Sequence, residues 1–166
     1  MACEEKDLFR DTPVRFLGYA NELGESLRPI IARSLVNTTY GVAGLYIAAE
    51  AVSKGSAKHA VMKGKCSETE RTAMTTAQMA DVVIWQGAAS VAIPGLVINR
   101  IVASVGWATK RMGRTGGLWR WAPTVCGLLS IPLIIHPIDT AVTVAMDATI
   151  RSWIPYMEPE KPRASQ

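Results

Sequence analysis

The sequence predicts an all-α fold: a multi-pass membrane helical bundle of about three transmembrane helices with an amphipathic N-terminal helix. Hydrophobic residues make up 49% of the 166 residues and charged residues only 19%, a composition more apolar than that of an ordinary soluble domain. Five Trp and four Tyr stand against two Phe, and Trp and Tyr favour the membrane–water interface. We therefore treat residues 1–166 as a single membrane domain.

An amphipathic helix over 13–27 is the first predicted element. Asp11, Thr12 and Pro13 form a helix start, in which a capping side chain precedes a proline at the first helical position. Apolar side chains then recur at helical spacing, at Phe16, Tyr19 or Ala20, Leu23 and Leu27. Two interpretations of this apolar face stay open: it lies on a membrane surface, or it packs on protein.

Three weakly charged stretches predict membrane helices over 31–51, 79–102 and 121–146. Their central parts, "SLVNTTYGVAGLYIAA", "VVIWQGAASVAIPGLVIN" and "WAPTVCGLLSIPLIIHPI", contain no Asp, Glu, Lys or Arg. A membrane helix needs about 17–25 mostly apolar residues, and the Gly and Ala of the first two stretches allow close helix packing in lipid. A fourth helix is a candidate around Asp139 to Trp153. The alternative is a soluble bundle of Ala/Gly-rich helices.

Polar segments separate and follow these stretches. Residues 53–71 are rich in lysine and predict a polar loop, and the tail 155–166 is Pro-rich, charged and predicted to be disordered. Residues 110–120, "KRMGRTGGLWR", form a basic turn beside three Trp residues, which is typical of an anchor at the membrane interface. Lys and Arg are nearly balanced between the two expected sides, so the membrane orientation is not predicted.

Two segments share an Ile-Pro pair before an aliphatic run: "SVAIPGLVINR" around Pro94 and "LLSIPLIIHPID" around Pro132. A proline inside a helix removes one backbone donor and kinks the chain, and lipid tolerates this only where a neighbouring group satisfies the freed carbonyl. We expect kinks at Pro94 and Pro132 that could nest against each other. Coincidence is the alternative explanation of so short a match.

Arg100, Asp139 and His136 are the candidate polar cluster within the membrane. Arg100 and Asp139 each follow an Ile-Pro pair, so they could pair across helices; snorkelling to the headgroups is the alternative. His136 and Asp139 lack a third catalytic group, and the chain contains no recognised nucleophile, metal-ligand or phosphate-binding motif. We therefore expect no enzyme activity, no cofactor and no metal. Nucleic-acid binding is not expected either, because the basic residues are spread through loops.

The segments "DLFRDTPVRFLGYANELGE", "SVAIPGLVINR" and "LLSIPLIIHPID", in this order, resemble the mitochondrial fission process protein family, also called the mitochondrial 18 kDa protein, from about Asp7 to Trp153. The resemblance implies an integral multi-pass protein of the mitochondrial inner membrane that promotes mitochondrial division and whose loss is linked to apoptosis. It implies no catalytic or cofactor residues. Pro13 departs from the pattern, because an aromatic residue is expected there. The acidic N-terminus is not a cleavable import sequence, so import would need internal signals.

The expected function is a non-enzymatic membrane scaffold or regulator of fission, with the lipid bilayer and other inner-membrane or fission-related proteins as partners. The alternative is a small transport or channel-modulating component in which Arg100, Asp139 and His136 line a polar path. A soluble helical interaction module is a third class, which holds only if the predicted spans do not insert.

Overall fold

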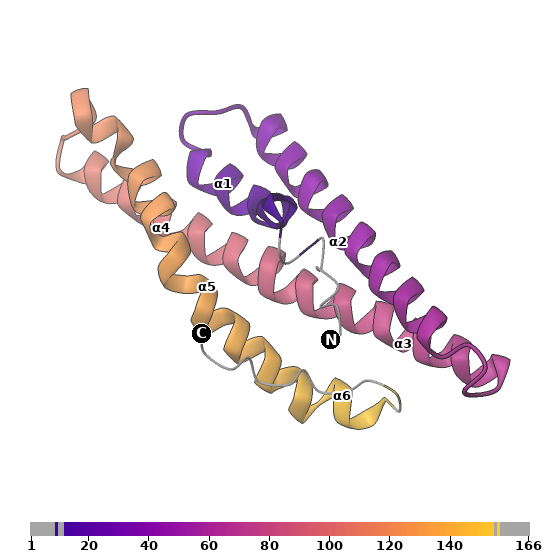
Figure 1. Ribbon diagram of the computed structural model, residues 1–166. Coiled ribbons are helices and arrows are strands. Elements are labelled where there is room, and N and C mark those ends of the chain that lie inside the picture. Colours follow the sequence, from indigo (N-terminus) through magenta and orange to yellow (C-terminus); the bar gives the residue numbers. More distant parts are fainter. Residues whose placement is uncertain (1–8, 10–11, 155, 157–166) are drawn as a thin grey trace.

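The computed structural model describes residues 9, 12–154 and 156, and this part of the chain forms helices and no strand (Figure 1). The elements are η1 (Pro13–Tyr19), α1 (Ala20–Leu27), α2 (Arg33–Val61), α3 (Glu68–Gln86), η2 (Gly87–Ala92), α4 (Ile93–Arg111), η3 (Gly117–Trp121), α5 (Ala122–Ala148) and α6 (Ile150–Trp153). η1 and η3 are 3-10 helices, and η2 is a π-helix. The predicted all-α class is confirmed. The predicted disordered tail, 155–166, lies outside the described residues except for Tyr156.

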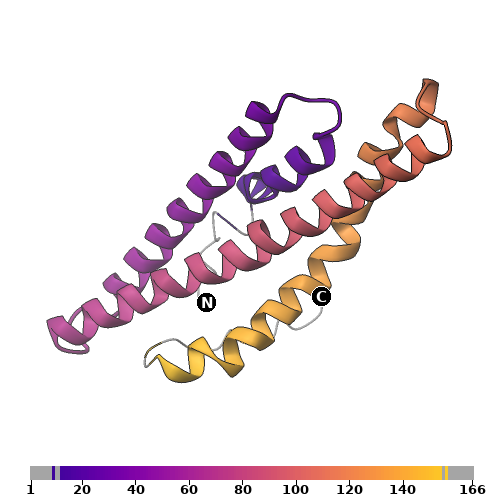
Figure 2. The same cartoon turned by 180° about the vertical axis from the view of Figure 1, so that it is seen from behind.

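One long continuous helix, which we call the rod, packs against α2 along one half and against α5 along the other. α3, η2 and α4 run without a break from Glu68 to Arg111, a stretch of 44 residues, which is about 66 Å of helix at 1.5 Å per residue. α2 packs along the α3 half and α5 along the α4 half, and the two connecting turns lie at opposite ends of the molecule (Figure 1, Figure 2). α1 lies between α2, α4 and α5 and contacts all three.

The predicted helix over 13–27 is present, but its polar side faces the interior. The helix start is as expected, since Thr12 Oγ1 accepts the backbone N–H of Val14 at 3.2 Å and Pro13 follows it. The buried residues of α1 are Asn21, Glu22, Gly24, Glu25 and Ser26. Phe16, Leu17 and Leu23 are instead 60%, 49% and 45% exposed. Packing on protein, one of the two interpretations of the apolar face, is therefore wrong for these three side chains.

The connection between α2 and α3 is shorter than the predicted loop over 53–71. α2 continues to Val61 and α3 begins at Glu68, which leaves a turn over 62–67. Lysine and alanine are good helix formers, and Lys58 and His59 lie in the last turn of α2, where cations complement the helix dipole. A capping box starts α3: Ser67 Oγ accepts from Glu70 N at 3.3 Å, and Glu70 Oε2 accepts from Ser67 N at 3.0 Å.

Two helical stretches of the described chain are long and apolar enough to cross a membrane, Glu68–Arg111 and Gly117–Trp153. They contain the predicted spans 79–102 and 121–146. The predicted span 31–51 lies in α2, which is not among these stretches. The predicted fourth helix is not separate, because α5 continues to Ala148 and only the four residues of α6 follow. Length and composition thus support two spans, and three or four are not confirmed.

Candidate functional site

A buried polar network centred on Glu25 joins α1 to its neighbours. The Glu25 carboxylate is 2% exposed and accepts hydrogen bonds from Arg28 Nε at 2.7 Å, Tyr40 Oη at 2.9 Å and Asn99 Nδ2 at 2.9 Å. Burial alone would raise the pKa of the Glu25 carboxyl, but the hydrogen bonds from Arg28, Asn99 and Tyr40 outweigh it and hold the pKa below its usual range. One charged side chain therefore fastens α1 to α2 and α4.

Asn21 forms hydrogen bonds to the backbone of the rod at η2, where the α-helix changes to a π-helix. Its Nδ2 donates to the Ser90 carbonyl at 3.1 Å and to the Val91 carbonyl at 3.4 Å, both within η2. η2 is a π-helix, in which the backbone N–H of residue i+5 bonds to the carbonyl of residue i, and Pro94, just after it, has no N–H to donate. Asn21 thus supplies a side-chain donor to two carbonyls beside the position where the proline removes a backbone donor. That Pro94 and Pro132 kink their helices stays a prediction.

Glu22 is a fully buried carboxyl on the same face of α1. Its relative exposure is 0%, and neither carboxylate oxygen has a hydrogen-bond partner in the part of the chain that the structure describes. Burial, and then the charge of Asp139 on α5, raise the pKa of Glu22 to about 8. Both causes disfavour the ionised form, so the interior of this bundle holds a carboxyl that takes up a proton near neutral pH.

Close approach of the helices depends on glycines that face these polar side chains. A Cβ at Gly95 of α4 would lie 2.6 Å from Tyr40 Oη, and a Cβ at Gly24 of α1 would lie 2.0 Å from Thr39 Oγ1. A Cβ at Gly127 of α5 would lie 2.8 Å from Val102 Cγ2. Atoms cannot approach so closely, so a side chain at any of these three positions would force its neighbours to move, and glycine allows the close packing of α1, α2, α4 and α5.

An ion-pair cluster joins the C-terminal end to the rod. Arg151 donates from Nε and Nη2 to the two carboxylate oxygens of Asp81, at 2.6 Å and 2.8 Å, and from Nη1 to Asp147 at 2.9 Å. The Arg151 side chain is 3% exposed. Sequence reasoning did not identify Arg151 as the partner of Asp81 and Asp147. The spacing of Asp147 and Arg151, four residues apart on a helix, could have indicated one of the two contacts.

The candidate residues named from the sequence lie apart. Arg100 is exposed on α4, His136 is exposed on α5, and Asp139 is half-buried on α5. Among the described residues no ion pair includes Arg100, and it is Glu22 that Asp139 influences. The proposed pairing of Arg100 with Asp139 therefore stays a prediction. The described chain contains no group of three or more His, Cys, Asp or Glu side chains that could hold a metal ion.

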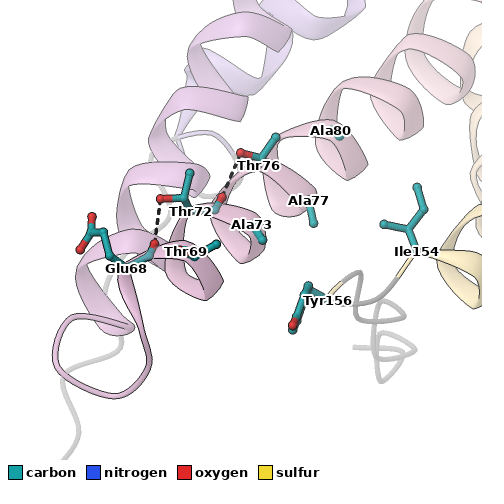
Figure 3. A pocket seen from close by; sticks show the side chains of 9 residues that line it. All are labelled: Glu68, Thr69, Thr72, Ala73, Thr76, Ala77, Ala80, Ile154 and Tyr156. Atoms are coloured by element: carbon teal, nitrogen blue, oxygen red, sulfur yellow. Dashed lines mark hydrogen bonds between the residues drawn. The ribbon is translucent and has the colours of Figure 1, made fainter.

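The groove along α3 offers little polar chemistry. It has a volume of about 800 Å³ and is lined by Glu68 at one end, by Thr and Ala side chains of α3, and by Ile154 and Tyr156 (Figure 3). Thr72 Oγ1 donates to the Glu68 carbonyl and Thr76 Oγ1 to the Thr72 carbonyl, each at 2.9 Å. These hydroxyls are used by their own helix, so the groove presents mainly methyl groups.

Comparison with known proteins identifies relatives along almost the whole chain. Residues 8–146 match the family described as Mitochondrial 18 KDa protein (MTP18). The chain is 42% identical over 160 residues to Mitochondrial fission process protein 1 of Homo sapiens, and the match covers 91% of this chain and 90% of the relative. The proteins of the same name in Caenorhabditis elegans and Danio rerio are 40% and 39% identical, with 89% and 93% of this chain and 88% and 92% of the relatives covered. No solved structure matches. The chain belongs to the Mitochondrial 18 kDa protein family.

Proposed function

We propose that this chain is an integral, multi-pass protein of the mitochondrial inner membrane that promotes mitochondrial division. It acts as a non-enzymatic scaffold or regulator, linked to mitochondrial integrity and apoptosis, and works with other inner-membrane or fission-related proteins. The names of its relatives, which are mitochondrial fission process proteins, support the role in division.

The observation that carries the membrane placement is an inverted distribution of polarity. Large apolar side chains face outward along the helices, among them Leu45 and Leu133, each 74% exposed. The interior holds, beside apolar side chains such as Ile98, the ionisable side chains of Glu22, Glu25 and Arg151. Water disfavours a surface of this kind, whereas lipid favours an apolar exterior and confines polar groups to the interior of a bundle. We therefore propose α2 as a third membrane-facing helix beside the two candidate spans, Glu68–Arg111 and Gly117–Trp153.

Two measurements test this proposal. Carbonate extraction of mitochondria should leave the chain in the membrane pellet, and its release into the supernatant would contradict membrane integration. Cells that lack the protein should contain elongated mitochondria, and re-expression should restore their normal length. Re-expressed Gly127→Val should fail to restore it, because the side chain would push α5 away from α4. Gly44→Val is the matched control, since a Cβ at Gly44 meets open space. Unchanged mitochondrial length without the protein would contradict a fission role.

A second candidate, a small transport or channel-modulating component, is favoured by Glu22. A buried carboxyl with no hydrogen-bond partner among the described residues, influenced by Asp139, is the kind of group through which a proton path passes. Proton flux into vesicles containing the purified chain would support this function if Glu22→Gln and Asp139→Asn abolish it. Flux that both variants retain, or no flux above that of empty vesicles, would exclude this path.

A further inference from the structure

The turn between α4 and α5 concentrates positive charge and tryptophan. Residues 107–121 contain four basic and three Trp residues: Lys110, Arg111, Arg114, Arg120, Trp107, Trp119 and Trp121. The sequence contains no Asp or Glu between Asp81 and Asp139. No ion pair or side-chain hydrogen bond within the described chain uses any of the four basic side chains. We call residues 107–121 the basic turn, and none of the described residues supplies a counter-charge to it.

The basic turn is folded and exposed. Every residue from Lys110 to Trp121 is exposed. Gly113 has a φ of 69°, and two backbone hydrogen bonds close the end of α4, from Gly113 N to the Lys110 carbonyl at 3.1 Å and from Arg114 N to the Thr109 carbonyl at 3.0 Å. The turn lies at the end of the molecule opposite the α2–α3 turn (Figure 1). The basic side chains therefore project from an ordered support.

Two guanidinium groups of the basic turn rest on tryptophan rings. Arg111 Cζ lies 5.7 Å from the centre of the Trp107 ring, and Arg114 Cζ lies 4.6 Å from the centre of the Trp119 ring. A guanidinium placed over a ring keeps its N–H groups free to donate in its own plane. Such a pair presents a phosphate donor beside an aromatic surface.

We propose that the basic turn binds the headgroups of anionic phospholipids. Guanidinium groups match phosphate oxygens in charge and geometry, and basic residues beside a membrane helix attract anionic lipid. The basic turn also exposes large apolar side chains to its surroundings: Leu118 is 89% exposed and Trp107 is 66% exposed. A bilayer provides acyl chains next to its phosphates, which matches exposed leucine and tryptophan side chains beside guanidinium groups. The turn joins the two candidate spans, so it reaches the bilayer surface where both lipid parts are present.

The test measures lipid binding to the full chain in neutral detergent micelles. Tryptophan fluorescence is followed while the micelles are doped with phosphatidylglycerol or, separately, with phosphatidylcholine. We expect phosphatidylglycerol to bind at least tenfold more tightly. Each basic residue near an anionic surface contributes about fivefold in affinity, so Arg111→Gln with Arg114→Gln should weaken binding about 25-fold. Lys63→Gln with Lys65→Gln is the matched control: it removes two exposed charges from the α2–α3 turn and should leave the affinity unchanged.

Several outcomes would overturn the proposal. Equal affinity for the two lipids, or an equal loss in the control variant, would show that the basic turn does not recognise the anionic headgroup. Competition by inorganic phosphate or by a single-stranded oligonucleotide as effective as phosphatidylglycerol would assign the turn to free phosphate or to nucleic acid. If circular dichroism shows that the arginine variant is misfolded, Lys110→Gln with Arg120→Gln replaces it with the same expectation. The proposal rests on the membrane placement above, and carbonate extraction tests that placement independently.

Discussion

At the scale of single residues, the polar side chains of α1 differ in how many hydrogen-bond partners the fold gives them. Glu25 accepts hydrogen bonds from three side chains and keeps its charge. Glu22, one residue after the paired Asn21, has no such partner among the described residues. A buried polar group without a hydrogen bond destabilises a fold, so Glu22 opposes the stability of the bundle whenever it is ionised.

Glu22→Gln should stabilise the protein at high pH. The folded state holds the Glu22 proton with a pKa raised from 4.5 to about 8, more tightly than the unfolded chain does. Ionisation of Glu22 therefore does not lower the free energy of unfolding below pH 4.5. It lowers that free energy increasingly between pH 4.5 and pH 8, and by about 3–5 kcal/mol above pH 8. Thermal denaturation in detergent should show the midpoint of the wild type falling between pH 5 and pH 9 by more than that of the variant.

Glu68→Gln is the control for this prediction, because Glu68 is exposed at the start of α3 and its pKa is lowered by its hydrogen bond to Arg71. Its carboxylate is ionised throughout the range from pH 5 to pH 9, so the substitution should not alter the slope. If the denaturation midpoints of the wild type and of Glu22→Gln change in parallel with pH, Glu22 does not titrate in the folded state.

At the scale of the elements, the bond from Asn21 to the Ser90 carbonyl should be coupled to Pro94. Asn21→Leu removes a donor from the Ser90 and Val91 carbonyls and should cost about 1–3 kcal/mol of unfolding free energy. In a Pro94→Ala background residue 94 regains its N–H, so the same substitution should cost at least about 1 kcal/mol less. Chemical denaturation of the four proteins in detergent measures the difference. If the stability changes of Asn21→Leu and Pro94→Ala simply add, Asn21 does not compensate for the proline. As a control, the stability changes of Asn21→Leu and Pro132→Ala, a proline on another helix, should add.

The helix contacts at glycine predict a contrast between two positions. Gly127→Ala introduces a Cβ 2.8 Å from Val102 Cγ2 and should destabilise the protein by about 1–3 kcal/mol through overpacking. Gly44→Ala enters open space and should stabilise it by up to about 1 kcal/mol, since alanine is the better helix former. Denaturation midpoints in detergent measure both changes. The same sign for the two variants would contradict the observed packing of α5 on α4.

The helices could be predicted from the sequence more completely than the polar site. Apolar runs and the cap at Thr12 indicate where helices lie. They do not indicate which face of a helix is buried, because an apolar face packs inward in water and outward in lipid. For this reason the sequence did not indicate that α1 buries its polar face. The contact of Asp81 with Arg151 joins residues 70 positions apart, and no local spacing reveals such a partner. Arg100 and Asp139 were named from their position after prolines, which does not determine where their side chains point.

At the scale of the whole molecule, the rod is longer than a bilayer is thick. Its 44 residues extend about 66 Å, whereas the hydrocarbon core is about 30 Å thick. The uncharged part of the rod is its middle, residues 82–99, so both ends of the rod project beyond the hydrocarbon core. The α2–α3 turn and the α4–α5 turn must then lie on opposite sides.

Cysteine labelling measures this topology. In a variant whose native Cys residues are replaced by Ser, Lys65→Cys and Arg114→Cys place a single thiol in each exposed turn. A maleimide that cannot cross membranes should label only one of them in intact mitoplasts, and both after the membrane is permeabilised. Labelling of both in intact mitoplasts would contradict a rod that crosses the bilayer once.

The position of α1 determines the order in which the chain can be assembled. α1 is synthesised before α2, α4 and α5, all of which it contacts, and the Asn99 side chain that bonds to Glu25 lies 74 residues further along the chain. Until α4 has been synthesised, the Glu25 carboxylate has Arg28 and Tyr40 but not Asn99 as hydrogen-bond partners. α1 can therefore complete its contacts only after α2, α4 and α5, which all follow it in the chain, have been made.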